Sequence, residues 1–401
     1  MTHPPPRHPL ADFLALRSRP SVRWIGLMSG TSCDGIDAAL IEVAEDAARG
    51  TPSVRCVGAS SLAFPAKRQT ALLQALAQPT DAETAARWDA RLGALFAATA
   101  RVVIEEYGPA DAVALSGHTF AHLPNERTTL QLGNPALVNE LLGIPVVAGF
   151  RAADVARGGE GAPLVPAGDR LVFARTDGAV AVINIGGISN VTWLPARTGS
   201  LFDDANEPRA ADCGPGNLIL NTLVRRATNG QELFDRDGVR AAAGRVRLEL
   251  LERWRRHPFL TKLAGSRPQR STGREEFGEA WVAAELEATA EIPLEDWLAT
   301  AVDWIAECIA LTLASLGGGR EPMRVLLGGG GARNPAILRA LARHIKVPTE
   351  VLDQKLHGVS ASLREAVAFA LLGHEYLHRR PGSFPGTTGC RFAGPLGALW
   401  V

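Results

Sequence analysis

Short apolar runs and longer stretches with helical spacing alternate along this chain. Ser21–Met28 and Ala38–Val43 each have the length and the flanking turn residues of a buried strand. Between them, the glycine-rich segment Ser29–Gly35 predicts a turn. Thr70–Glu106 then places apolar residues at the spacing of a helix. The first part of the chain is therefore predicted to fold as strand, turn, strand and helix.

The same order of elements returns further along the chain. Val180–Ile185 and Val191–Leu194 read as strands on either side of the turn Gly186–Asn190. Two such units predict a duplicated architecture with a cleft between its halves, and the alternation of strands and helices indicates the α/β class. The other expected elements are strands at Ala112–Leu115, Val146–Ala148 and Arg324–Leu327, a hairpin-like segment at Leu130–Leu132, and helices at Ala136–Leu142, Asn217–Arg226, Val239–Arg256, Glu275–Ala290, Asp296–Gly317, Pro335–His344 and Ser360–Arg380.

Composition excludes several classes of protein. The chain has 401 residues, 46% of them hydrophobic, which suits two or three domains of roughly 150 residues each. Its 42 basic residues equal its 42 acidic residues, which argues against a dedicated nucleic-acid binder. No apolar run approaches the ~20 residues that span a bilayer, and residues 1–20 lack the apolar core of a signal peptide. We expect a cytoplasmic protein with reduced cysteines, no membrane partner, and a flexible proline-rich tail over residues 1–20.

The first glycine-rich turn has the composition of an anion-binding loop. Gly26–Asp37 reads GLMSGTSCDGID. Its glycines let the backbone approach a ligand, and its N–H groups converge on anionic oxygens. Thr31 and Ser32 add hydroxyl donors, while Asp34 and Asp37 supply carboxylates of the kind that hold a metal ion or its waters. A plain hairpin with a polar tip has the same composition, because Gly and Asp are ordinary turn formers.

Two more turns suit phosphate. Asn184–Asn190 and Gly328–Asn334 are glycine-rich and follow strands, and the second leads into a helix. Neither has the spacing of a Walker loop or of a Rossmann fingerprint. Together with the first turn they predict a nucleotide in a cleft. Asp212, in the segment ADCGPGN, precedes a tight turn at a helix start and suits a general base, although a capping aspartate looks the same.

Two histidine pairs are candidate metal or substrate residues. His374–His378 reads HEYLH, which matches the zinc motif HExxH with Glu375 as the base. The predicted helix that carries it ends at Pro381, and apolar residues share the face of the two histidines. His118 and His122 are flanked by glycine and proline, which suits a substrate loop better than a helical metal site.

GLMSGTSCDGID closely resembles the signature of the anhydro-N-acetylmuramic acid kinases, and the resemblance extends from about Ile25 to Leu399. It implies the two-lobed actin-like ATPase fold with duplicated ribonuclease H-like lobes and ATP in the interlobe cleft. The N-terminal lobe is then expected at residues 21–165 plus about 376–401, the C-terminal lobe at 166–375, and the protein as a homodimer. The other matching blocks are TLQLGNPALV at Thr129–Val138, GGEGAPLVP at Gly158–Pro166, NIGGISNVT at Asn184–Thr192, DCGPGN at Asp212–Asn217, STGREEF at Ser271–Phe277, GGGGARNP at Gly328–Pro335 and EAVAFALL at Glu365–Leu372.

The resemblance also implies roles for individual residues. Asp212 would be the general base, and Glu365 would help to place the attacking water. Mg²⁺ would be held through water by Asp37. The implied ATP-binding residues are Gly30, Thr31, Ser32, Cys33, Asp34, Gly35, Ile36, Asp37, Gly186, Gly187, Asn190, Gly329, Gly330 and Asn334, and the implied substrate-binding residues are His118, Asn134, Arg151, Gly214 and Asn217.

The implied reaction uses ATP, 1,6-anhydro-N-acetylmuramic acid and water, and gives N-acetylmuramic acid 6-phosphate and ADP, a step of peptidoglycan recycling. Asp212 would deprotonate the water that attacks C1, and the freed O6 would take the γ-phosphoryl group, with Mg²⁺ offsetting the charge. Three segments depart from the family pattern: Ser116–Thr119 stands where HGQT is typical, Asn134 where GDPA has its aspartate, and Gly149 where ADFR has its aspartate. A kinase for another anhydro-sugar such as levoglucosan, a chaperone- or actin-like ATP switch, and a zinc hydrolase are the alternatives.

Overall fold

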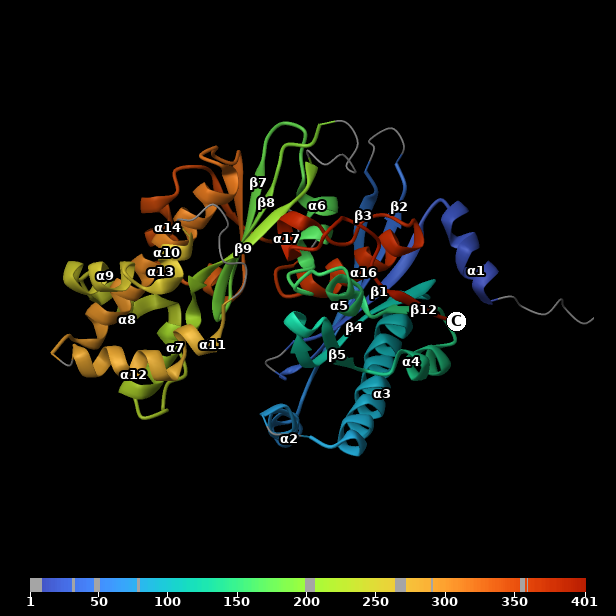
Figure 1. Ribbon diagram of the computed structural model, residues 1–401, viewed down its shortest axis with the longest axis horizontal. Coiled ribbons are helices and arrows are strands. Elements are labelled where there is room, and N and C mark those ends of the chain that lie inside the picture. The colour runs from blue at the N-terminus through green and yellow to red at the C-terminus, as the bar shows by residue number, and fades with distance from the viewer. Residues whose placement is uncertain are drawn as a thin grey trace, which may run out of the picture. The chain divides into compact units, whose positions relative to one another are not determined.

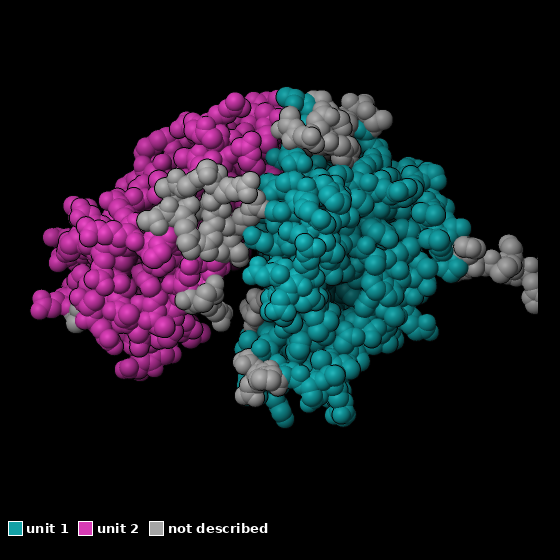
Figure 2. Space-filling view, in the orientation of Figure 1, with its two compact units in different colours: residues 1–173, 198–207, 353–401 teal, residues 174–197, 208–352 magenta. Residues whose placement is uncertain are grey.

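The computed structural model describes residues 9–30, 33–46, 51–77, 80–198, 206–263, 272–289, 291–353, 358 and 360–401 (Figure 1). The chain divides into two compact units (Figure 2). Unit 1 comprises residues 1–173, 198–207 and 353–401, and unit 2 comprises residues 174–197 and 208–352. Each unit contains one mixed sheet with helices packed on it, which confirms the predicted α/β class.

The sheet of unit 1 begins as an antiparallel meander, continues with two parallel strands and ends on an antiparallel edge strand. Its order is β3-β2-β1-β4-β6-β12, with β5 paired to β4. β1 pairs antiparallel with β2 and parallel with β4, and β4 pairs parallel with β6. The strands are β1 (Val22–Ser29), β2 (Gly35–Ala44), β3 (Ser53–Ala63), β4 (Ala112–Leu123), β5 (Thr128–Leu132), β6 (Val146–Ala148) and β12 (Ala398–Trp400).

The sheet of unit 2 repeats this topology. Its order is β9-β8-β7-β10-β11, with an antiparallel meander β7-β8-β9 followed by β10 parallel to β7 and β11 parallel to β10. The path β3-β2-β1-β4-β6 of unit 1 therefore matches the path β9-β8-β7-β10-β11 of unit 2 in order and in strand direction, with β5 and β12 as additions in unit 1, as the predicted duplication of ribonuclease H-like lobes requires. The strands are β7 (Val180–Ile185), β8 (Ile188–Leu194), β9 (Arg209–Pro215), β10 (Arg324–Gly328) and β11 (Thr349–Val351).

Helices cover both faces of β1 in unit 1, which is why this strand is apolar along most of its length. Ile25 and Leu27 share a core with residues of α3, while Gly26 faces α16. Figure 1 shows α3 as the long helix of this unit. The helices of unit 1 are α1 (Pro9–Ala15), α2 (Ala66–Ala77), α3 (Ala82–Tyr107), α4 (Pro135–Leu142), α5 (Phe150–Ala156), α6 (Val165–Phe173), α16 (Arg364–Leu377) and α17 (Pro385–Thr388).

Gly26 is the point of closest approach between β1 and α16. A Cβ atom there would lie 1.8 Å from the carbonyl oxygen of Ala366, which is backbone and cannot rotate away. We therefore expect Gly26→Ala to lower the free energy of unfolding by about 3 kcal/mol, the upper end of the usual cost of overpacking a core. Urea unfolding of the purified variant measures this. Gly143→Ala, where nothing lies within 4 Å of the added carbon but φ is +68°, shows what backbone strain costs when a glycine is replaced without a clash, about 1 kcal/mol.

Unit 2 is built around the long helix α13. The ring of Trp254 packs between those of two tryptophans of this helix, with its centroid 5.1 Å from that of Trp297 and 5.1 Å from that of Trp304. Within the described residues, α13 alone is long and apolar enough to cross a membrane, and its apolar side chains form the core of this unit. The helices of unit 2 are α7 (Asn217–Ala227), α8 (Val239–Ala243), α9 (Leu248–Arg255), α10 (Pro258–Leu263), α11 (Arg274–Phe277), α12 (Glu279–Ala288), α13 (Leu294–Gly317) and α14 (Pro335–His344).

Three expected helices are broken. The helix expected at Val239–Arg256 divides at Gly244, where a Cβ would lie 1.9 Å from the carbonyl oxygen of Glu295. The one expected at Glu275–Ala290 divides at Gly278. The one expected at Thr70–Glu106 divides into α2 and α3, and Asp81 caps α3 by accepting a hydrogen bond from the backbone of Thr84. In each case local chemistry ends a periodic apolar pattern.

Two expected boundaries also differ. The expected flexible tail contains the helix α1, because Phe13 is buried and meets the ring of Trp24 edge-on at 6.3 Å. Residues 166–173 and 353–375 were expected in the second lobe but belong to unit 1. The reason is packing, since α6 and α16 contact each other and α16 contacts β1, β2 and β4.

Candidate functional site

The first glycine-rich turn joins β1 to β2 in unit 1. Ser29 Oγ donates to the carbonyl of Gly35 at 2.8 Å, and the backbone N–H of Cys33 donates to the carbonyl of Gly30 at 3.1 Å. Cys33 has a φ of +54° and is fully buried, so its thiol supports the turn from inside. Thr31 and Ser32, predicted to bind phosphate, lie outside the described residues. The described part of the turn is closely hydrogen-bonded.

His118 supports this turn from β4. Its Nδ1 lies 3.1 Å from Ser29 Oγ and its Nε2 lies 3.6 Å from Cys33 Sγ. The side chain is fully buried, and desolvation lowers its pKa to about 4. The sequence assigned His118 to the substrate, but the imidazole is neutral and inaccessible in this unit, and its contacts hold the turn.

His118 makes the stability of the protein dependent on pH. An unfolded histidine binds a proton near pH 6.5, whereas the folded His118 does so only near pH 4. The unfolded state therefore binds more protons between these values, and stability falls as the pH falls from about 6.5 toward 4. We expect His118→Gln to make the fall in the free energy of unfolding on acidification smaller by up to about 3 kcal/mol. Chemical denaturation at pH 7 and pH 4.5 measures it, and an unchanged difference between the two pH values would contradict the prediction.

Two carboxylates stand at the start of β2. Asp34 is exposed, and Asp37 accepts a hydrogen bond from Ser61. Desolvation raises the pKa of Asp37, Ser61 opposes the rise, and the nearby Asp34 charge adds to it. A carboxylate whose negative charge is unfavourable, next to a second carboxylate, suits a hydrated divalent cation. The donor set present therefore fits Mg²⁺ held through water.

Arg151 and Glu365 form a charged pair near the start of α16. The Nη1 of Arg151 donates to the carbonyl of Gly161 at 3.0 Å, its guanidinium lies 5.6 Å from the ring of Phe369, and its Nε is buried without a partner among the described residues. Surrounding protein raises the pKa of Glu365, while Arg151 and Arg364 oppose the rise. The Glu365 side chain is exposed, so solvent also acts against that rise.

A buried ion pair fixes the first turn of α16. Arg364 donates through Nε to Asp169 Oδ1 at 2.7 Å and through Nη2 to the other carboxylate oxygen. Both side chains are buried. Because Arg364 directly precedes Glu365, this pair determines where α16 begins and where Glu365 stands.

The two positions where the family pattern has an aspartate and this chain does not both have left-handed backbone. Asn134 has a φ of +31° and Gly149 a φ of +76°, and they cap α4 and α5. Asn134 Oδ1 accepts from the backbone of Leu137 at 2.9 Å. Asparagine and glycine adopt this conformation more readily than most residues. The two positions border a cavity of about 220 Å³ in unit 1 that Ser116, Gln131 and Trp400 also line.

In unit 2, the second glycine turn is tied to the start of α7. The backbone N–H groups of Asn217 and Leu218 donate to the carbonyls of Gly186 and Gly187 at 2.8 and 3.0 Å. A Cβ on Gly216 would lie 2.6 Å from the carbonyl oxygen of Gly186. This contact explains the glycine before α7 and brings the turn against the helix start.

Asp212 lies on β9 opposite Asn190 of β8. Its Oδ2 accepts a hydrogen bond from the backbone N–H of Thr272 at 2.8 Å. The capping alternative does not hold, because α7 is capped by Gly216 without a side-chain hydrogen bond. Asp212 and the predicted Asn190 are therefore neighbours, while Gly214, with a φ of +104°, lies against the ring of Phe259.

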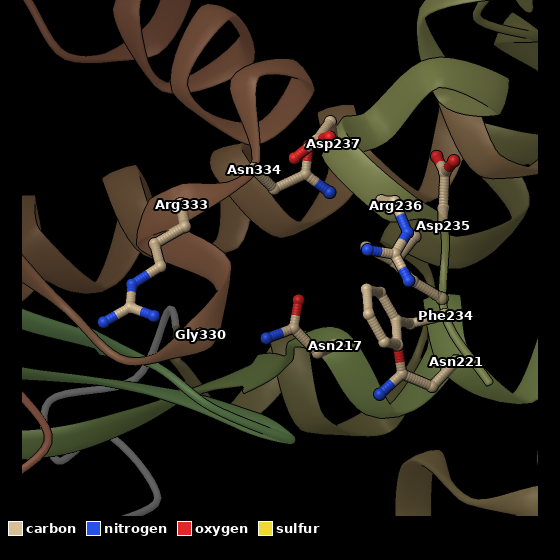
Figure 3. Close-up of a pocket in the computed structure, with 10 residues that line it drawn as sticks. Asn217, Asn221, Phe234, Asp235, Arg236, Asp237, Gly330, Arg333 and Asn334 are labelled. Carbon is tan, nitrogen blue, oxygen red and sulfur yellow. The ribbon is translucent and has the colours of Figure 1, made fainter.

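A cavity of about 410 Å³ lies beside the start of α7. It brings together three predicted residues, Asn217, Gly330 and Asn334. Figure 3 shows the Asn217 side chain pointing into the cavity between Arg333 on one side and Arg236 and Phe234 on the other. Asn334 caps α14, and Gly329 has a φ of +79° beside the carbonyl of Ile185. The sequence analysis missed the lining residues Leu220, Asn221, Phe234, Asp235, Arg236, Asp237 and Arg333.

The HExxH motif lies in an ion-pair cluster of unit 1. Glu375 is buried, 3.5 Å from Arg170 and 3.4 Å from Arg380. His374 Nε2 lies 2.8 Å from Glu45 Oε1, and Glu45, His374 and His378 offer ligand atoms within 4.8 Å of one another. Arg380 donates to both Glu45 oxygens, and Glu375 faces arginines. The base that a zinc hydrolase needs is therefore engaged elsewhere.

The family model described as anhydro-N-acetylmuramic acid kinase matches residues 22–401. The chain belongs to this family. Relatives named anhydro-N-acetylmuramic acid kinase are 39% identical over 389 residues in Variovorax paradoxus and 37% identical over 385 residues in Pseudomonas paraeruginosa, each covering 94% of this chain and 98% of the relative. The solved xylulose kinase from Lactobacillus acidophilus aligns with a TM-score of 0.44 at 10% identity over 89% of each chain.

The match confirms the identification made from the sequence motifs and the prediction that the protein is a kinase. It does not test the individual site residues. Those that the structure places together in unit 2 are Asn190 with Asp212, and Asn217 with Gly330 and Asn334. Those that it places together in unit 1 are the described residues of the first turn with His118, and Arg151 with Glu365.

Proposed function

We propose that this protein opens 1,6-anhydro-N-acetylmuramic acid with water and phosphorylates O6 with ATP. The observation that carries the proposal is the place of Asp212. Its carboxylate accepts a hydrogen bond from the N–H of Thr272 and lies on β9 just before the Gly214–Gly216 turn. That turn leads into α7, whose first turn borders the 410 Å³ cavity. A base positioned near a nucleotide-sized cavity is what the coupled reaction requires.

Unit 2 supplies the nucleotide contacts in this proposal. The cavity holds the adenosine, with Phe234 as a surface for the base and with Gly330 and Asn334 at its edge. The turn at Gly186 and Gly187 offers backbone next to the phosphates. Arg236 and Arg333 line the cavity together with Asp235 and Asp237, so the charges of the lining balance, which suits the uncharged adenosine part of the nucleotide.

Unit 1 supplies the remaining contacts. In this proposal the turn from Gly30 to Asp37 contributes contacts to phosphate, and Asp37 would hold a Mg²⁺ through water, which would supply positive charge to offset that of the phosphates. Arg151, whose Nε is buried without a described partner, donates to the sugar, and Glu365 helps to place the attacking water. Asn134 contributes to the sugar side through the cavity that it borders.

The proposed reaction balances as follows. Water gives a proton to Asp212, and its oxygen bonds to C1 while the C1–O6 bond breaks. O6 takes the γ-phosphoryl group and ADP leaves. A general base of this kind accelerates a reaction about 100- to 10,000-fold. Because Asn134 and Gly149 stand where the family pattern has aspartates, a kinase for another anhydro-sugar such as levoglucosan is the second candidate.

An ADP-release assay with ATP and Mg²⁺ tests the proposal across five conditions. These are 1,6-anhydro-N-acetylmuramic acid, levoglucosan, N-acetylglucosamine, glucose and no sugar. The proposal expects ADP only with the muramic anhydro-sugar. ADP with levoglucosan instead would establish the second candidate, and ADP that is independent of sugar would indicate a nucleotide switch.

We further propose that the protein acts in the cytoplasm as a homodimer. The metabolic reaction of the family supports the location, and the family resemblance supports the dimer. Sedimentation velocity of the full chain tests the second point, because a monomer at micromolar concentration would contradict it.

A further inference from the structure

A groove between α2 and α3 of unit 1 lies outside every residue assigned to the reaction. Its volume is about 630 Å³, within the range of small-molecule sites. Its apolar surface comes from Pro65, Trp88 and Leu95, and its basic groups are Lys67, Arg68 and Arg91. Trp88 is 8% exposed, so most of the indole is buried and one part faces the groove.

The three basic side chains have no carboxylate partner among the described residues. α2 contains no acidic residue, and the carboxylates nearby on α3 are engaged. Glu83 pairs with Arg87, and Asp89 accepts from the backbone of Gly133 and Asn134 at 2.8 and 2.9 Å. The groove therefore carries three positive charges that the described protein does not neutralise.

The guanidinium groups of the two arginines lie over aromatic rings. Arg91 lies 5.7 Å from the ring centroid of Trp88, and Arg68 lies 5.6 Å from that of Phe64. The ring attracts the cation and leaves the N–H donors of the guanidinium able to bind an anion. The arrangement offers cations above an apolar floor, which matches a ligand with a charged group on an apolar body.

We propose that the groove binds a small organic anion whose apolar or aromatic body lies against Trp88 and whose negative group is held by Lys67, Arg68 and Arg91. The charge complementarity favours this occupant over an uncharged apolar one. The proposal does not depend on the proposed reaction, because none of these residues belongs to the turns assigned to it.

Hydrogen bonds also connect the groove to two turns of unit 1, the turn between β1 and β2 and the turn at Gly133 and Asn134. The N–H of Phe64, under Arg68, donates to the carbonyl of Asp34 at 2.8 Å. Asp89, next to Trp88, holds the turn at Gly133 and Asn134. An occupied groove is therefore placed to affect the phosphate turn and the Asn134 turn through these hydrogen bonds.

Fluorescence titration of the full chain with 8-anilinonaphthalene-1-sulfonate tests the proposal, with saturating ADP present to occupy the other site. The variant Lys67→Gln/Arg91→Gln removes two charges and leaves the buried floor intact. Arg320→Gln/Lys346→Gln, at exposed positions of unit 2, removes two charges elsewhere. The neutral analogue N-phenyl-1-naphthylamine reports what apolar contact alone achieves.

We expect one site in the wild type and binding about tenfold weaker in Lys67→Gln/Arg91→Gln, because two exposed ion pairs are lost and each contributes up to about fivefold. The control variant should match the wild type, and the neutral analogue should bind more weakly. Equal affinity in the two variants, or equal affinity for the neutral analogue, would overturn the proposal. A change of oligomeric state confined to Lys67→Gln/Arg91→Gln would assign the groove to a second copy of the chain and would also overturn it.

Discussion

Replacing Asp212 with asparagine is expected to lower kcat by about 100- to 10,000-fold, because the water that attacks C1 loses its proton acceptor. Asparagine keeps the size of the side chain and an oxygen that can accept from the Thr272 N–H, so the local fold should persist. Nucleotide affinity should stay within a few-fold of the wild type. Initial rates of ADP release and calorimetric titration with ADP measure the two quantities.

Asp177→Asn is the matched control for Asp212→Asn. Asp177 is an exposed aspartate of the same unit that pairs with Arg175 on the surface. It should retain full turnover. An Asp212→Asn enzyme that turns over like this control would remove Asp212 from the role of base, while loss of nucleotide binding together with turnover would indicate a structural role.

Replacing Asp169 with alanine is expected to lower the free energy of unfolding by about 3–5 kcal/mol, the usual cost of leaving one member of a buried ion pair alone. Arg364 is buried and has Asp169 as its bidentate partner. Without it the guanidinium keeps its charge, because an arginine does not deprotonate in proteins. Urea unfolding monitored by tryptophan fluorescence measures the change.

The double variant Asp169→Leu/Arg364→Met separates charge from packing. It removes both buried charges and keeps similar volume, so its stability should return to within about 1.5 kcal/mol of the wild type. If the double variant were as unstable as Asp169→Ala, the loss would come from packing, and the account of a charged pair fixing the start of α16 would be wrong.

The sequence predicts those parts of the fold that depend on local pattern. β1 with β2 and β7 with β8 are short apolar runs around glycine turns, and both form as expected. Patterns also mislead where one residue decides: Gly244 ends a helix because the backbone of Glu295 lies against it. The packing of α6 on α16, which moves both helices into unit 1, joins segments about 200 residues apart and leaves no local signal.

The candidate site divides in the same way. Asp212 and the glycine turns stand out because their residue types match their chemistry. Phe234 and Arg236 do not, since they line the cavity only where their loop meets the start of α7 and the Gly330 turn. The one signal that the sequence offered is a phenylalanine in the otherwise largely polar segment Gln231–Gly238. His118 looked like a loop residue, and only the structure shows its contacts with Ser29 and Cys33.

The central claim is that one active enzyme couples ring opening to phosphorylation. Mass spectrometry of the sugar product tests it most directly, with 1,6-anhydro-N-acetylmuramic acid, ATP and Mg²⁺ supplied in water enriched in heavy oxygen. The account predicts a single product that has gained one heavy-oxygen water and one phosphoryl group, formed only when ATP is consumed. A phosphorylated product that keeps the anhydro bridge, or an opened sugar formed without ATP, would contradict it.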